Sequence, residues 1–234
     1  MTRDELAAAG FDLDPAHYAL LTRFVRCLME ENERLNLTAA GSEAEVWRVH
    51  VCDSLALLPA VRSVPAARVL DLGSGGGLPG LPLACVCESA HVTLVDATRK
   101  KVAALERIIA RLGLTNARAV WGRAETIAHD PACREQFDVV TARAVATTAV
   151  LVEYAAGFVR VGGSCLFFKS AASAEAERTS AESAARTCGL DYAETRTYRL
   201  PGESEPRALV EYRKVHPLDA RLPRAAGRAR KRPF

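Results

Sequence analysis

Apolar segments of strand length alternate with helix-like segments along most of this chain of 234 residues. Repeated strand–helix units predict an α/β fold with a doubly wound, mostly parallel sheet. The last two strands have only Pro201-Gly202 as a turn signal between them, which predicts an antiparallel hairpin at the sheet edge. The seven expected strands are 68–72, 92–95, 117–121, 137–141, 164–168, 191–200 and 207–213.

Helices are predicted between these strands. The clearest runs from Arg99 to Leu112, where apolar residues recur at three- and four-residue spacing and Gly113 provides a stop. Further helical segments are expected at 81–86, 147–159 and 172–187.

The first sixty residues have a purely helical pattern. Asp14 before Pro15 is a typical helix start, and apolar residues then repeat at helical spacing as far as Met29. Ser42 and Glu45 predict a capping box for a second helix. We therefore expect a helical N-terminal extension at residues 1–62 and an α/β domain at residues 63–214.

Composition indicates a soluble protein, since 49% of the residues are hydrophobic and 25% are charged. No run of about eighteen apolar residues is present, so we expect no membrane span. The N-terminus lacks the apolar core of a signal peptide. The seven cysteines are scattered without a Cys-x-x-Cys or Cys/His ligand cluster, which favours free thiols in a reducing cytoplasm and predicts no metal site.

The net charge of +3 is unevenly distributed. Residues 213–234 contain eight Lys or Arg residues and a single acid, Asp219. We expect a basic C-terminal tail, residues 215–234, that neutralises nucleic-acid phosphates. The alternative is a solvated terminus without a ligand.

A glycine-rich loop, Asp71-Leu-Gly-Ser-Gly-Gly-Gly-Leu-Pro-Gly80, follows the first expected strand. Its last three spaced glycines fit a dinucleotide fingerprint. The loop more closely resembles that of S-adenosylmethionine-dependent methyltransferases, because Asp71 precedes the first glycine. A carboxylate there suits the cationic amino-acid end of that cofactor and repels a pyrophosphate. A nicotinamide-dependent oxidoreductase and a non-enzymatic rRNA-binding or assembly factor remain alternatives.

Other polar residues follow the remaining parallel strands, where ligands bind in open α/β sheets. Asp96 is placed either to bind ribose hydroxyls or to cap the helix that follows. Ala124-Glu125 follows the third strand, either beside an adenine ring or as a surface turn without a ligand. Arg143 and Lys169 end the fourth and fifth strands, and for Arg143 an ordinary surface cation is the alternative. The fourth strand is not followed by the Pro-Pro-aromatic or Pro-Cys signatures of methyltransferases that act on exocyclic amines or cytosine C5.

Together these residues resemble the bacterial 16S ribosomal RNA guanine-N7 methyltransferases, the glucose-inhibited division protein B group, over roughly residues 30–234. Such a match implies a class I, Rossmann-like methyltransferase fold with S-adenosylmethionine as methyl donor. The residues that carry the resemblance are Asn36-Leu-Thr38, His50-x-x-Asp53-Ser54, the loop from Asp71 to Gly80, Leu94-Val-Asp96, Lys100-Lys101, Gly122-Arg-Ala-Glu125, Arg143-Ala-Val145, Lys169, Pro223-Arg224, Gly227 and Lys231-Arg-Pro233.

The resemblance also implies a set of cofactor contacts, to which the loop pattern adds three residues. Implied by the family are Gly73, Leu78, Asp96, Ala124, Glu125 and Arg143; the loop adds Asp71, Ser74 and Gly75. The implied product is 7-methylguanosine in the decoding-region loop of 16S rRNA, whether the substrate is free rRNA, the 30S subunit or an assembly intermediate. Guanine N7 carries a free lone pair at neutral pH, so no general base is assigned.

Guanine N7 lies in the deep groove of A-form RNA, so an unpaired target base is expected. We hypothesise that Arg123, Arg143 or Lys169 donates to guanine O6. His50 and Asp53 could ligate a metal, but a hydrogen-bonded pair that docks the N-terminal helices over the cofactor is favoured. We expect a monomeric, cytoplasmic enzyme.

Overall fold

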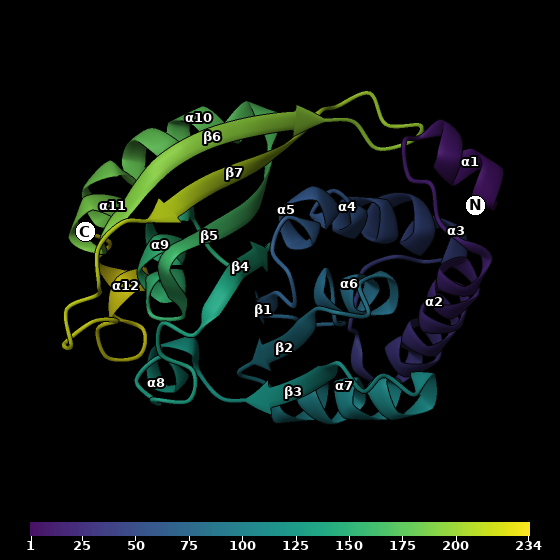
Figure 1. Cartoon of the computed structure of the whole chain (residues 1–234), viewed down its shortest axis with the longest axis horizontal. Coiled ribbons are helices and arrows are strands. Elements are labelled where there is room, and N and C mark those ends of the chain that lie inside the picture. Colours follow the sequence, from purple (N-terminus) through teal and green to yellow (C-terminus); the bar gives the residue numbers. More distant parts are fainter.

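The seven expected strands form one sheet in the order β3-β2-β1-β4-β5-β7-β6 in the computed structural model of residues 1–234 (Figure 1). The first five strands pair in parallel, and β6 and β7 form the antiparallel hairpin at the sheet edge that the sequence predicts. β7 also pairs antiparallel with β5, which the sequence does not specify. The strands are β1 (Arg68–Leu72), β2 (His91–Asp96), β3 (Ala117–Trp121), β4 (Phe137–Arg143), β5 (Val159–Ser170), β6 (Leu190–Tyr198) and β7 (Arg207–Lys214).

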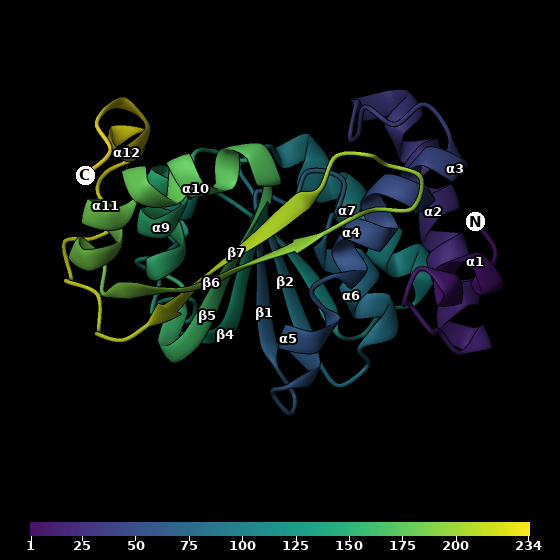
Figure 2. The same cartoon turned by 90° about the horizontal axis from the view of Figure 1, so that it is seen from above.

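Both faces of the sheet are apolar. Successive side chains of a strand point to opposite sides, and here the residues on both sides are apolar and buried. Val69 and Val139 belong to one buried cluster, while Leu70 and Val140 belong to the other. Helices α6 (Gly80–Val86) and α7 (Arg99–Leu112) cover the first face. The second face is covered by α8 (Ala124–Ile127), α9 (Thr148–Ala156), α10 (Ala171–Ser180) and α11 (Glu182–Thr187) (Figures 1 and 2).

The N-terminal extension is helical, and it packs beside α6 and α7 (Figure 2). The predicted start of the long helix is correct, since Asp14 Oδ1 accepts the His17 N–H at 2.8 Å. The predicted capping box forms only by half, because Ser42 caps Glu45 while the Glu45 carboxylate accepts the Gly41 N–H instead. The elements are α1 (Arg3–Ala8), α2 (Pro15–Leu35), α3 (Glu43–Glu45), the π-helical η1 (Val46–Val51), α4 (Cys52–Leu55) and α5 (Leu58–Arg62).

The extension shares its buried cluster with the sheet. Leu21, Phe24 and Leu28 of α2 belong to the same core as Leu81 of α6 and Leu105 of α7. Its helices therefore bury their apolar stripes on the α/β domain rather than on one another alone.

The C-terminal segment, residues 215–234, is folded against the body of the molecule. Its sequence predicts a basic tail that binds phosphates or is solvated, and does not predict this packing. The Arg224 guanidinium forms an ion pair with Glu153 of α9, whose carboxylate is buried. Ala229, in α12 (Arg228–Lys231), is also buried. The two chain ends lie at opposite ends of the molecule (Figure 1).

All seven cysteines are buried and free, in agreement with the sequence prediction. No helix has both the length and the apolar character needed to cross a bilayer.

Candidate cofactor and substrate site

The glycine loop connects β1 to α6 at the carboxyl edge of the sheet. Gly73 adopts φ +71°, and a Cβ placed there would lie only 2.6 Å from Val145 Cγ2. Gly73 therefore permits both the left-handed turn and the close approach of the segment that follows β4.

Two aspartates hold this loop through its backbone. Asp71 is fully buried, and its Oδ2 accepts the Gly80 N–H at 2.9 Å. Asp96, at the end of β2, accepts the Gly75 N–H at 3.0 Å and the Thr98 N–H at 2.7 Å. Asp96 does not cap α7 as expected, because Thr98 is the N-cap of that helix and no side chain caps it. Asp96 instead forms a turn with Thr98 just before the helix and ties the loop to β2.

A cavity of about 370 Å³ opens beside the loop, which we call the first cavity. Four of the residues expected to bind cofactor line it: Gly73, Asp96, Ala124 and Glu125. Its complete lining is Leu72, Gly73, Val95, Asp96, Ala97, Thr98, Lys101, Gly122, Arg123, Ala124, Glu125, Ala144, Val145, Tyr154, Gly227 and Arg230.

The other expected cofactor residues lie outside this lining. Ser74 is buried and donates its hydroxyl hydrogen to the Asp71 carbonyl at 2.9 Å. Leu78 belongs to the apolar core. Asp71, Ser74, Gly75 and Leu78 thus shape the loop, which places the Gly73 backbone at the cavity wall.

The C-terminal segment, residues 215–234, supplies part of the first cavity through Gly227 and Arg230, a placement not expected from the sequence. Glu125 Oε1 accepts the Gly227 N–H at 2.8 Å, and Arg230 donates to the Val145 carbonyl at 3.2 Å. Burial opposes ionisation of Glu125, but hydrogen bonds from Gly227 and from the Tyr154 hydroxyl lower its pKa below the ordinary value. Glu125 therefore stays ionised and fixes the segment over the cavity.

A second cavity, of about 620 Å³, adjoins the first, because Ala144 and Val145 line both. Arg143 and Lys169, two of the three expected guanine contacts, line it, whereas Arg123 lines the first cavity instead. The lining is Arg143, Ala144, Val145, Ala146, Phe168, Lys169, Ser170, Ser173, Glu177, Glu203, Glu205, Pro206 and Arg207.

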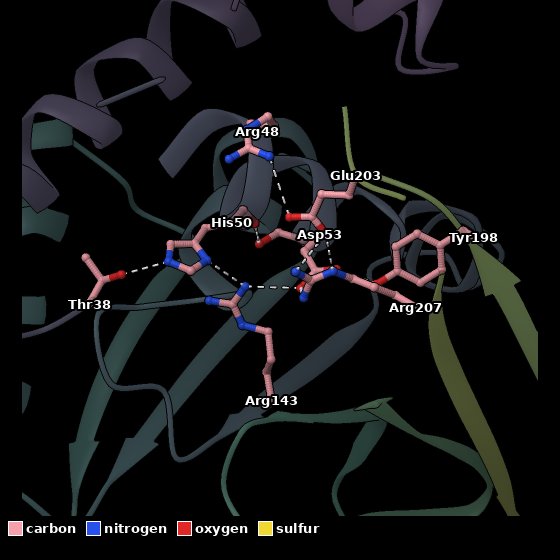
Figure 3. Close-up of polar contacts among 9 residues, drawn as sticks. Thr38, Arg48, His50, Asp53, Arg143, Tyr198, Glu203 and Arg207 are labelled. Atoms are coloured by element: carbon pink, nitrogen blue, oxygen red, sulfur yellow. Dashed lines mark hydrogen bonds and ion pairs between the residues drawn. The ribbon is translucent and has the colours of Figure 1, made fainter. Parts of the chain in front are cut away.

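Arg143 is held in place from the N-terminal extension (Figure 3). Its NH1 group donates to His50 Nδ1 at 3.1 Å and to Asp53 Oδ2 at 3.2 Å. Because a guanidinium only donates, His50 accepts at Nδ1 and donates from Nε2 to the Thr38 hydroxyl at 2.7 Å. Burial, together with the charges of Arg143 and Arg207, lowers the pKa of His50 to about 4, so this imidazole is neutral.

Asp53 has no exposed surface and is surrounded by donors (Figure 3). The Tyr198 hydroxyl donates to its Oδ1 at 2.5 Å, and Arg207 NH1 donates to its Oδ2 at 3.3 Å. The expectation that His50 and Asp53 form a direct hydrogen bond is therefore wrong. Arg143 lies between the two side chains and donates to both. Tyr198 and Arg207 were not expected from the sequence, because the hairpin that carries them is about 150 residues from Asp53.

Lys169 is engaged within the protein. Its ammonium group donates to the Ala146 carbonyl at 3.0 Å and pairs with Glu177 of α10 at 2.5 Å. These bonds place the segment 144–147 between the two cavities, so Lys169 has a structural role besides lining the second cavity.

Comparison with known proteins decides between the alternatives. The model of the family described as rRNA small subunit methyltransferase G matches residues 17–200. Relatives of that name align over nearly the whole chain. The Moorella thermoacetica protein is 38% identical over 99% of this chain and 98% of the relative. The Roseiflexus castenholzii protein is 41% identical over 96% of this chain and 95% of the relative.

The chain belongs to the rRNA small subunit methyltransferase G family. It is a methyltransferase, and the resemblance noted in the sequence is confirmed. Solved structures show the same fold: a SAM-dependent methyltransferase from Aquifex aeolicus aligns with TM-score 0.56 and 13% identity over 82% of this chain and 98% of that one. TrmN from Thermus thermophilus aligns with TM-score 0.53 and 19% identity over 79% of this chain and 53% of TrmN.

S-adenosylmethionine, the methyl donor of this enzyme, fits the first cavity. The cavity has the size of a small-molecule site, and Asp96 presents a carboxylate that can accept hydrogen bonds from hydroxyl groups. A Cβ at Gly73 would meet Val145, which also lines the cavity, so only glycine allows these two parts of the wall to pack together. We propose that Asp96, Gly73 and Ala124, which line this cavity, hold the nucleoside of the donor and its neighbouring chain.

Proposed function

We propose that this enzyme methylates N7 of a specific guanine in the decoding-region loop of 16S rRNA. The observation that carries the proposal is the pair of adjoining cavities. The first suits the methyl donor, and the second is lined by the cationic side chains of Arg143, Lys169 and Arg207. Since the two share Ala144 and Val145, a base in the second cavity would lie next to the donor.

The chemistry asks little of the protein beyond alignment. S-adenosylmethionine supplies an electrophilic methyl group when it is bound. Guanine N7 already has a lone pair, so no side chain has to remove a proton. Holding two reactants in the correct geometry lowers a barrier by roughly 7–11 kcal/mol.

Arg143 is the residue best placed to orient the base. Both of its bonds to His50 and Asp53 use NH1, which leaves the Nε and NH2 hydrogens for a ligand. We infer that these hydrogens are donated to guanine O6, which leaves N7 free.

Basic residues at the rim of the first cavity support an RNA substrate. Lys101, Arg123 and Arg230 line the cavity, and Lys231 and Arg232 are exposed beside Arg230 in the chain. Cations in this number bind phosphates and make affinity dependent on salt. We infer that this rim binds the RNA backbone and that the enzyme acts as a monomer in the cytoplasm.

The test uses 30S subunits that lack the modification and methyl-labelled S-adenosylmethionine. Label at N7 of one decoding-region guanine is the expected result. Arg143→Ala should lower kcat/KM by at least about tenfold, by loss of orientation. Arg186→Ala, which removes an exposed arginine of α11 that lines neither cavity, should leave it unchanged. Saturable cofactor and RNA binding without transfer would favour an assembly factor and contradict the proposal.

A further inference from the structure

Three glutamates line the second cavity, and one of them has no partner in the protein. Glu177 is paired with Lys169, and Glu203 is paired with Arg207. Glu205 forms no hydrogen bond or ion pair, and it is exposed in the loop between β6 and β7. A carboxylate that lines a cavity without an ion-pair or hydrogen-bond partner is available to accept hydrogen bonds from a ligand.

The polar groups of the cavity come from two sides. Arg143 and Lys169 end β4 and β5, whereas Glu205 belongs to the hairpin loop. The loop is fixed close to Glu205, since Arg207 binds both Glu203 and Asp53. Donors and an acceptor are therefore presented to one ligand from separate elements that are anchored to each other.

Guanine has the complementary distribution of polar groups. Its Hoogsteen edge carries the acceptors O6 and N7. Its Watson–Crick edge carries the N1–H and N2–H₂ donors, which match the two oxygens of a carboxylate. Adenine presents an unprotonated N1 on that edge, and a carboxylate repels such a lone pair.

We propose that Glu205 recognises the Watson–Crick edge of the target guanine, accepting hydrogen bonds from N1–H and N2–H₂. The proposal rests on the proposed function and adds the residue that selects guanine. With this edge on Glu205 and O6 on Arg143, the N7 lone pair of the base is left without a protein donor and stays free for the methyl group.

The experiment compares two preparations of 30S subunits, whose ligated 16S rRNA carries either guanosine or inosine at the modified position. Inosine lacks only the 2-amino group, so O6, N7 and N1–H are kept. The unchanged enzyme should prefer guanosine by at least about tenfold in kcat/KM, because a site built around a hydrogen bond rejects the analogue that lacks it. In Glu205→Gln the preference should fall to about twofold or less, since an amide has only one acceptor oxygen.

Glu194→Gln is the matched control, because it makes the same change at an exposed position of the same hairpin. It should keep the preference of the unchanged enzyme. Glu205→Ala is a second variant, and it should also lose the preference while S-adenosylmethionine affinity stays the same.

Retention of the guanosine preference in both Glu205 variants would overturn the proposal, as would equal use of the two RNAs by the unchanged enzyme. In either case methylation of guanosine-containing subunits would leave the proposed function standing. Absence of transfer to both RNAs by the unchanged enzyme would overturn the proposed function, and this inference with it.

Discussion

Asp71 is a carboxylic acid enclosed by the fold. One oxygen accepts the Gly80 N–H, and the other, Oδ1, has no hydrogen-bond partner. Burial raises the pKa of Asp71 to about 7, and the Gly80 hydrogen bond and the charge of Arg143 only partly oppose this. The folded chain therefore holds the Asp71 proton more tightly than the unfolded chain does.

This raised pKa gives a pH dependence with a definite sign. The stabilisation by the Asp71 proton is complete below about pH 4 and is lost as the pH rises through about 7. Asp71→Asn cannot lose that proton. Its unfolding free energy minus that of the unchanged chain should therefore increase between these pH values, by up to about 4 kcal/mol.

Urea unfolding followed by circular dichroism at several pH values measures this difference. Asp191→Asn, an exposed aspartate on β6, is the control and should follow the unchanged chain at every pH. Parallel curves for Asp71→Asn and the unchanged chain would show that Asp71 is ionised throughout.

At the scale of elements, Arg224 is one of several residues that attach the C-terminal segment to the body of the molecule. Its guanidinium binds both oxygens of Glu153, a buried residue of α9. Arg224→Ala would leave Glu153 as a buried charge without its partner. We expect a loss of about 3 kcal/mol in the free energy of unfolding. Weaker binding of S-adenosylmethionine should accompany it, because Gly227 and Arg230 line the first cavity.

Thermal unfolding and cofactor titration test both expectations. The comparison is Arg221→Ala, which removes an arginine paired with Asp219 at an exposed position and should cost less than about 1 kcal/mol. Equal losses of cofactor affinity in the two variants would mean that the C-terminal segment contributes little to the site.

The sequence predicted most elements because each has a local signal. The spacing of apolar residues located α7, and Asp14 before Pro15 located α2. The charge of the C-terminal segment and its family motifs predict a tail but not its contacts, because the partner of Arg224 is 71 residues away and no pattern within the segment indicates it. The capping box failed by half for a related reason, since Glu45 had a competing backbone N–H at Gly41.

At the scale of the whole molecule, Asp53 links parts of the chain that are far apart in sequence. It connects α4 with Arg143 at the end of β4, with Tyr198 at the end of β6 and with Arg207 at the start of β7. Burial raises the pKa of Tyr198, which keeps this hydroxyl protonated as a donor. None of these four residues lines the first cavity, whereas Arg143 and Arg207 line the second.

Asp53→Asn should therefore separate the two halves of the site. The amide keeps the shape of the side chain but removes the charge that holds the two arginines. We expect kcat/KM for the 30S subunit to fall at least about tenfold through misplacement of Arg143. The dissociation constant of S-adenosylmethionine should stay within about twofold.

Asp12→Asn, an exposed aspartate near the start of α2, is the control for this variant. If Asp53→Asn weakened cofactor binding as much as it slowed transfer, the two cavities would not be independent. The motif His50-x-x-Asp53 indicated that these residues matter, but only the folded chain shows that both act on Arg143.

The strand order also determines when the acceptor side of the site can form. β7 lies between β5 and β6, although the ribosome makes β6 first. While the chain is being synthesised, β6 has no neighbour to pair with until β7 has emerged and inserted. Arg207 of the second cavity takes its place in the same step. An enzyme proposed to modify ribosomes thus completes its acceptor pocket only after residue 214 has left the exit tunnel of one.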